Sequence, residues 1–190
     1  MKPSYNIIIG IFVTLLLISS NSQGRHLLIR TGAAHGGWTG FGTGFQDIAF
    51  DVDDQELVVH CDWDSATWGL AIMFSLDKQI NGRKIKAIRA KVKTMNGSKT
   101  HFYTGMSTVD DATIELSRHK ALELTDTWRI YELPVIEMES LQPEEGARIF
   151  DDGDWDRIRI VKLLFTKPKG TDIPKDVIVI RNPEIVFHRN

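Results

Sequence analysis

The pattern of hydrophobic and polar positions predicts short β-strands along most of the chain. It is clearest over Arg83–Lys93, where apolar and basic residues alternate. The apolar positions are Ile88, Ala90 and Val92, and the basic ones are Arg89, Lys91 and Lys93. A period of two is typical of an antiparallel strand with one buried face. Ile158–Phe165 and Val177–Ile180 are apolar on both faces and predict central strands.

The whole chain contains eleven such segments, separated by turn residues. We expect strands at Leu27–Thr31, Asp47–Val52, Glu56–Trp63, Trp68–Leu76, Ile85–Thr94, Thr100–Met106, Ala112–Leu116, Ala121–Leu124, Trp128–Pro134, Ile158–Thr166 and Val177–Phe187. Turn pairs stand between them, and Asn81-Gly82 and Asn96-Gly97 are the type that favours hairpins. Gly32–Gly44 is too rich in glycine for a helix, and the one short helix candidate is Met138–Glu145. The sequence therefore predicts an all-β fold, a two-sheet antiparallel β-sandwich.

The first 24 residues have the pattern of a cleavable secretory signal. Lys2 precedes the apolar stretch Ile7–Ile18, and Ser20-x-Ser22 satisfies the small-residue rule for cleavage. Twelve apolar residues in a helix cover about 18 Å, less than the ~30 Å of a bilayer core. We expect residues 1–24 to be removed and residues 25–190 to form one domain with no membrane span. Its location would be secreted, periplasmic or at the cell surface.

Charge and cysteine content narrow the functional classes. The chain has 23 basic and 25 acidic residues, which argues against a general nucleic-acid binder. Cys61 is the only cysteine, so no disulfide can form within the chain. It lies in the apolar run Leu57–Cys61 and is expected to be a buried filler rather than a nucleophile.

The order of the segments resembles a known fold family. Thr125-Asp126-Thr127-Trp128-Arg129-Ile130-Tyr131 precedes a late strand, and Val177–Ile185 closes the chain as an apolar strand containing Arg181-Asn182. This is similar to the galactose-binding-like β-jelly-roll of many non-catalytic carbohydrate-binding modules. The resemblance implies a jelly roll with Trp128 in its core and a polysaccharide or glycan as partner. Arg181 replaces an acidic residue that ligates structural calcium in many relatives, so the presence of calcium stays open.

Aromatic residues are the first candidates for a sugar site, because sugar rings stack their C–H faces on flat π surfaces. Trp63 and Trp68 flank the loop Asp64–Thr67 and are expected at its rim. Trp38 and Tyr103 are further candidates, whereas Trp155 is expected to be structural. The basic row contributes Arg89 and Lys91, which could pair with carboxylates or sulfates of an acidic polysaccharide, although a solvated face with acidic partners is the alternative.

No pattern in the sequence singles out a catalytic or metal centre. The six histidines lack zinc-site spacing, and no Gly-x-Ser-x-Gly motif is present. Asp151-Asp152-Gly153-Asp154 predicts a turn rather than a calcium loop. The leading hypothesis is a carbohydrate-binding β-sandwich without catalysis. The alternatives are a small polysaccharide lyase or glycoside hydrolase using His101 or Tyr103, and a structural or adhesive surface protein.

Overall fold

The computed structural model describes residues 26–28, 38–51, 56–116, 120–140, 148–170 and 173–189. The expected signal segment Met1–Gly24 lies outside the described residues. Of the described chain, no helix is long and apolar enough to cross a bilayer.

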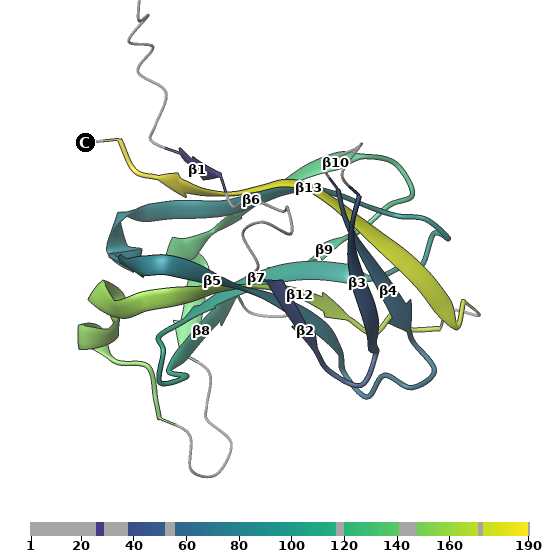
Figure 1. Cartoon of the computed structure of the whole chain (residues 1–190), viewed down its shortest axis with the longest axis horizontal. Coiled ribbons are helices and arrows are strands. Elements are labelled where there is room, and N and C mark those ends of the chain that lie inside the picture. Colours follow the sequence, from purple (N-terminus) through teal and green to yellow (C-terminus); the bar gives the residue numbers. More distant parts are fainter. Residues whose placement is uncertain are drawn as a thin grey trace, which may run out of the picture.

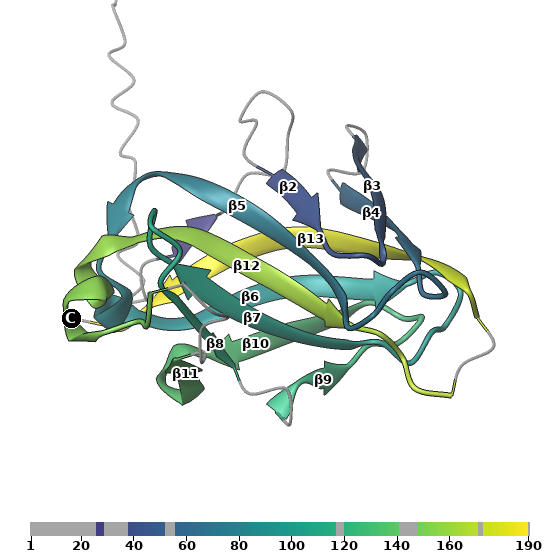
Figure 2. The ribbon, with the colours of Figure 1, turned by 90° about the horizontal axis from the view of Figure 1, so that it is seen from below.

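Two antiparallel sheets face each other, as expected from the spacing of the strands (Figure 1). Sheet A has the order β10-β6-β13-β4-β3, and β1 pairs with β13. Its strands are β1 His26–Leu28, β3 Phe45–Asp51, β4 Glu56–Asp62, β6 Ile85–Thr94, β10 Arg129–Pro134 and β13 Lys175–Phe187. Sheet B has the order β11-β8-β7-β12-β5-β2, and β9 pairs with β7 (Figure 2). Its strands are β2 Trp38–Phe41, β5 Gly69–Ile80, β7 His101–Ser107, β8 Thr113–Leu116, β9 Leu122–Glu123, β11 Met138–Ser140 and β12 Ile158–Thr166.

The core lies between the sheets and is built by the period-two faces of the strands. On β6 the apolar positions Ile88, Ala90 and Val92 are fully buried, so the predicted alternation is confirmed. The ring of Phe102 on β7 contacts Tyr131 of the other sheet edge to face, with centroids 5.9 Å apart. The two segments predicted as central strands are confirmed, since β12 lies between β7 and β5 and β13 lies between β6 and β4.

The two Asn-Gly pairs do not form hairpins, which corrects the prediction. Each pair lies where the chain passes from one sheet to the other, at β5 to β6 and at β6 to β7. The Asn81 side chain accepts a hydrogen bond from the Arg83 N–H and begins the 3-10 turn Gly82–Lys84. The local turn chemistry is therefore present, but it connects the sheets instead of pairing neighbouring strands. Two further 3-10 turns lie at Val135–Glu137 and Asp152–Arg157.

Two strands differ from the expectations. The helix candidate Met138–Glu145 begins instead as β11, because Met138–Ser140 pairs with β8; residues 141–147 lie outside the described part. The glycine-rich stretch contributes β2, which pairs with β5. Gly40 is required there, since a Cβ at this position would lie 2.0 Å from the Phe45 ring.

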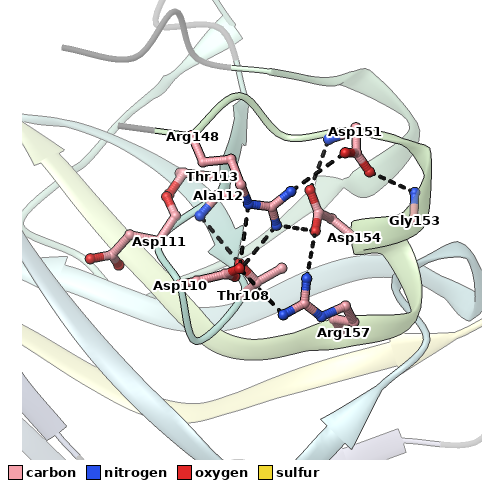
Figure 3. Close-up of polar contacts among 10 residues, drawn as sticks. All are labelled: Thr108, Asp110, Asp111, Ala112, Thr113, Arg148, Asp151, Gly153, Asp154 and Arg157. Atoms are coloured by element: carbon pink, nitrogen blue, oxygen red, sulfur yellow. Dashed lines mark hydrogen bonds and ion pairs between the residues drawn. The ribbon is translucent and has the colours of Figure 1, made fainter. Parts of the chain in front are cut away.

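An ion-pair network ties together three segments at one end of the sandwich, and we call it the Arg148 clamp (Figure 3). Arg148 and Arg157 both bind Asp110 of the β7–β8 turn and the buried Asp154 of the last 3-10 turn. The Asp151 side chain accepts from the Gly153 N–H, and Asp154 accepts from the Asp151 N–H at 2.9 Å. The predicted turn at Asp151–Asp154 is thus confirmed, and its carboxylates bind arginines and backbone N–H groups.

The clamp shifts the pKa values of its carboxyl groups. A hydrogen bond from Thr108, with further ones from Arg148, lowers the pKa of Asp110 to about 2. Burial opposes ionisation of Asp154, but hydrogen bonds from Arg148 and the Asp151 backbone bring its pKa below the usual value. Both groups are therefore held as carboxylates, which favours the folded state at neutral pH.

Candidate functional site

A groove of about 850 Å³ lies at the end of sheet B where three connections meet. We call it the Trp68 groove. Its lining residues come from the β4–β5 connection, the β6–β7 connection, strands β7, β9 and β12, and the β12–β13 connection. They are Thr67, Trp68, Lys99, His101, Glu123, Thr166, Lys167, Pro168, Lys169 and Gly170.

The β4–β5 connection places Trp68 by local hydrogen bonds. An Asp62 carboxylate oxygen accepts from the backbone N–H groups of Asp64 and Ser65 at 3.1 and 3.3 Å, which makes a tight turn directly after β4. Thr67 donates its N–H to the Thr43 hydroxyl at 2.8 Å. The half-buried Trp68 packs against the core and borders the groove.

Gly69 is required immediately after this tryptophan. Its φ is +143°, and a Cβ there would lie 1.9 Å from the Phe165 carbonyl oxygen. The close approach of β5 to β12 at this point brings the two connections together. Lys167 then donates its N–H to the Trp68 carbonyl at 2.8 Å and its Nζ to the Ala66 carbonyl at 2.9 Å.

Strands β7 and β9 also contribute to the lining of the groove. His101 on β7 lies opposite Glu123 on β9 in the strand register. Its backbone N–H donates to the Thr166 hydroxyl at 3.3 Å. Leu124 donates its N–H to the Thr100 carbonyl at 2.8 Å, which holds β9 against the β6–β7 connection that carries Lys99.

The groove combines positive charge with an aromatic side chain. Lys99, Lys167 and Lys169 are exposed cations, and Glu123 is the one acidic residue among its lining residues. Ammonium groups and an indole are the groups that pair with an anion and stack on an apolar surface. Chemically, the groove suits a ligand that carries negative charge and a flat apolar face.

Two predicted site residues are buried instead. The Trp63 side chain is only 1% exposed, so its expected place at a loop rim is wrong. Leu57, Val59 and Cys61 on β4 point into the core, and the same alternation carries Trp63 inward. Tyr103 is 0% exposed beside Leu164 of β12. Neither side chain offers surface to a ligand in this structure, so we do not retain them in the site.

The predicted basic row lies on the outer face of sheet A, away from the lining of the groove. Arg89 is paired with Glu184 at 2.5 Å and with Glu132 at 3.7 Å, which agrees with the alternative of a solvated face with acidic partners. Lys91 and Lys93 instead face the indole of Trp128. The structure places Trp38 in β2 opposite Phe74, and its side chain lies outside the description.

Trp128 is not a core residue, contrary to what the resemblance implied. Its half-buried ring lies on the outer face of sheet A, where Arg181 also faces it with Cζ 4.8 Å from the ring centroid. The core position belongs to Tyr131, which is buried and donates its hydroxyl to the Glu123 carbonyl at 3.2 Å. Trp155 packs against the core and contacts Phe150 edge to face, as expected of a structural tryptophan.

Arg181 also bears on the question of calcium. At the position where the family resemblance implied an acidic calcium ligand, Arg181 forms an ion pair with Glu56 across β13 and β4. Among the described residues, no group of three or more His, Cys, Asp or Glu side chains could hold a metal ion. This donor set does not fit a structural calcium site at β13.

The sequence did not predict the three lysines of the groove. Lys99, Lys167 and Lys169 lie on two connections that are about 70 residues apart in sequence, so no spacing brings them together. The one feature that they share in the sequence is their place next to a predicted strand: Lys99 precedes one, and Lys167 and Lys169 follow another.

Comparison with known proteins supports the fold. No protein-family model matches the sequence, and no curated protein is significantly similar to it. The structure is similar to the family 11 carbohydrate-binding module of Clostridium thermocellum in complex with a β-1,3-1,4-mixed-linked tetrasaccharide, with a TM-score of 0.60 and 13% identity over 87% of this chain and 96% of that chain.

Two other solved structures share the fold. The family 29 module CBM29_1 of Piromyces equi has a TM-score of 0.51 and 13% identity, over 87% of this chain and 91% of that chain. The agarase AgWH50C has a TM-score of 0.57 and 7% identity, over 87% of this chain and 25% of that chain. The chain therefore has the β-jelly-roll fold found in carbohydrate-binding modules.

Proposed function

We propose that the protein is an exported, non-catalytic carbohydrate-binding protein that holds an acidic polysaccharide in the Trp68 groove. The observation that carries this proposal is the half-buried Trp68 beside three exposed lysines in one groove of about 850 Å³. The jelly-roll fold supports the carbohydrate class, because the neighbouring module structures are described as carbohydrate-binding.

Each part of the groove has a separate task. The indole of Trp68 stacks on the apolar face of a sugar ring, and Lys99 and Lys169 pair with its carboxylate or sulfate groups. Lys167 is held by the Ala66 carbonyl and keeps the wall of the groove in place. The rival hypothesis of a lyase or hydrolase uses His101 or Tyr103 as acid or base; His101 lines the groove, whereas Tyr103 is buried.

The test is calorimetric titration of the protein with polygalacturonate, dextran sulfate and neutral dextran, beside a glycan array. Trp68→Ala should weaken binding about three- to tenfold, as expected for one aromatic contact. The double variant Lys99→Gln and Lys169→Gln should bind more weakly and depend less on salt. The charge-matched control is Lys78→Gln with Lys84→Gln, because these exposed lysines lie near the Ile80 end of β5 and in the 3-10 turn that follows it, and neither lines the groove.

Four outcomes decide the proposal. Selective loss in the groove variants supports it. Equal binding by the wild-type protein and every groove variant would overturn it, as would a failure to bind any glycan at low salt. Release of unsaturated or reducing ends from polygalacturonate would replace it with the enzymatic alternative.

A further inference from the structure

A second concentration of positive charge lies on the outer face of sheet A, around Trp128. We define the Trp128 patch as Lys91, Lys93, Trp128 and Arg181. The Lys91 and Lys93 Nζ atoms lie 5.4 and 4.7 Å from the indole centroid, and Arg181 Cζ lies 4.8 Å from it. Three cations therefore gather around one aromatic ring.

The strand register shows that the charges of the Trp128 patch are balanced differently from those of the neighbouring row in the same sheet. One row across the sheet places Arg89 between Glu132 and Glu184, so its charge is neutralised on both sides. In the next row Lys91 stands directly opposite Arg181. Like charges in directly opposed positions destabilise a sheet.

Acidic partners compensate only part of the charge in the patch. Arg181 is paired with Glu56, which is largely buried. Within the described part of the chain, no ion pair involves Lys91 or Lys93. Their contact with the indole is a weak compensation, since a cation–π contact at an exposed site contributes about 0.5–1 kcal/mol. The patch thus keeps two lysines whose charge is available to an anion.

The side chain next to Lys91 on the other flank is apolar and accessible. Ile130 on β10 is paired with Lys91 and is 69% exposed. A flat aromatic ring, an exposed aliphatic group and two available ammonium groups are what a charged sugar needs, since its ring has apolar faces and its substituents carry the charge.

The patch and the Trp68 groove are joined by the β9–β10 connection. Glu123 of the groove begins this connection and Trp128 ends it. Thr94, next to Lys93, donates its N–H to the Thr125 carbonyl at 2.9 Å, so the connection lies against the end of β6. The two sites are therefore linked by one short hydrogen-bonded segment.

We infer that the Trp128 patch is a second binding site for the sulfate or carboxylate groups of an acidic polysaccharide. It shares the ligand class of the proposed function but uses different residues on the other sheet. Each site can therefore fail without the other.

The experiment compares dextran sulfate with polygalacturonate, using neutral dextran as the uncharged control. The double variant Lys91→Gln and Lys93→Gln should lose about threefold in affinity per lysine for the anionic polymer that occupies the patch. Trp128→Ala should weaken the same polymer, and the effect should disappear at high salt for the lysines but persist in part for the indole. The polymer that responds identifies sulfate or carboxylate as the preferred group.

Thermal stability separates a binding role from a structural one. Removing Lys91 relieves its opposition to Arg181, which offsets the loss of the two lysine contacts with the indole, so the lysine double variant should keep nearly the same melting temperature while it binds more weakly. A structural cluster would give the reverse, with a lower melting temperature and unchanged binding, and this result would overturn the inference. The pair Lys78→Gln and Lys84→Gln controls for net charge, and the groove variants report on the proposed function independently.

Discussion

Replacing Asp154 by asparagine tests whether the Arg148 clamp stabilises the end of the sandwich. The carboxylate is 1% exposed and accepts hydrogen bonds from Arg148, Arg157 and the Asp151 backbone. A hydrogen bond to a charged group contributes about 1.5–3 kcal/mol. Arg148 and Arg157 are 38% and 45% exposed, so water recovers part of their loss, and we expect a cost of about 2 kcal/mol. For a domain of this size, this corresponds to a fall in Tm of about 4–8 °C.

The dependence of this effect on pH gives the sharper test. The folded pKa of Asp154 is lowered, so its stabilisation is present above the unfolded pKa of about 3.9 and is lost as pH falls towards the lower folded value. The wild-type protein and Asp154→Asn should therefore differ in urea midpoint at pH 7 and converge below about pH 4. Asp110, with a pKa of about 2, extends the acid-sensitive range of the wild-type protein downwards.

A matched variant in the same turn is Asp152→Asn. Its carboxylate is 92% exposed and pairs with an Arg83 side chain that is 54% exposed, so its removal should cost at most about 1 kcal/mol. An equal loss in both variants, or a difference between wild type and Asp154→Asn that stays constant down to pH 3, would refute the assignment of stability to the clamp.

Three further predictions concern single positions. Trp63→Ala should lower the free energy of unfolding by about 3–5 kcal/mol in urea titrations, and Trp68→Ala should lower it clearly less because Trp68 is only half-buried. Similar losses in the two variants would contradict the difference in burial. Gly69→Ala should unfold the protein or lower its Tm far more than Gly97→Ala, because Gly69 meets the Phe165 carbonyl while Gly97, also at positive φ, has open space around it; equal Tm values would disprove this close approach. Cys61 should resist iodoacetamide in the native protein and react in denaturant, since burial raises the pKa of its thiol, and mass spectrometry of the native protein would expose an error as a prompt mass increase.

The sequence predicted the two-sheet fold and most strand positions correctly, because a strand with alternating apolar residues, such as β6, can bury only its apolar face. The same alternation also gives the orientation of two tryptophans. The adjacent loop had suggested that Trp63 lies at its rim, and the family resemblance had implied that Trp128 lies in the core. Trp63 continues the series of inward-facing residues on β4. Trp128 is three residues before the inward-facing Tyr131, and an odd separation along an extended chain places Trp128 and Tyr131 on opposite faces. A parity argument would have placed both tryptophans correctly.

The sequence could not predict the groove. Trp68 could be selected as an aromatic residue next to a strand, but its neighbours Lys99 and Lys169 come from connections distant in the chain. Which connections meet at one end depends on the order of strands in each sheet, and Asn81-Gly82 and Asn96-Gly97 pointed to hairpins where the chain changes sheet.

The division of labour between strands and connections bears on how such a protein can evolve. Much of the lining of the Trp68 groove lies on the connections after β4, β6 and β12, while the buried apolar residues lie mainly on the strands themselves. Substitutions in the connections can therefore change ligand preference with little effect on the core, because loops tolerate change better than packed strands. Libraries randomised at Lys99, Lys167 and Lys169 would be a practical route to new specificities on an unchanged scaffold.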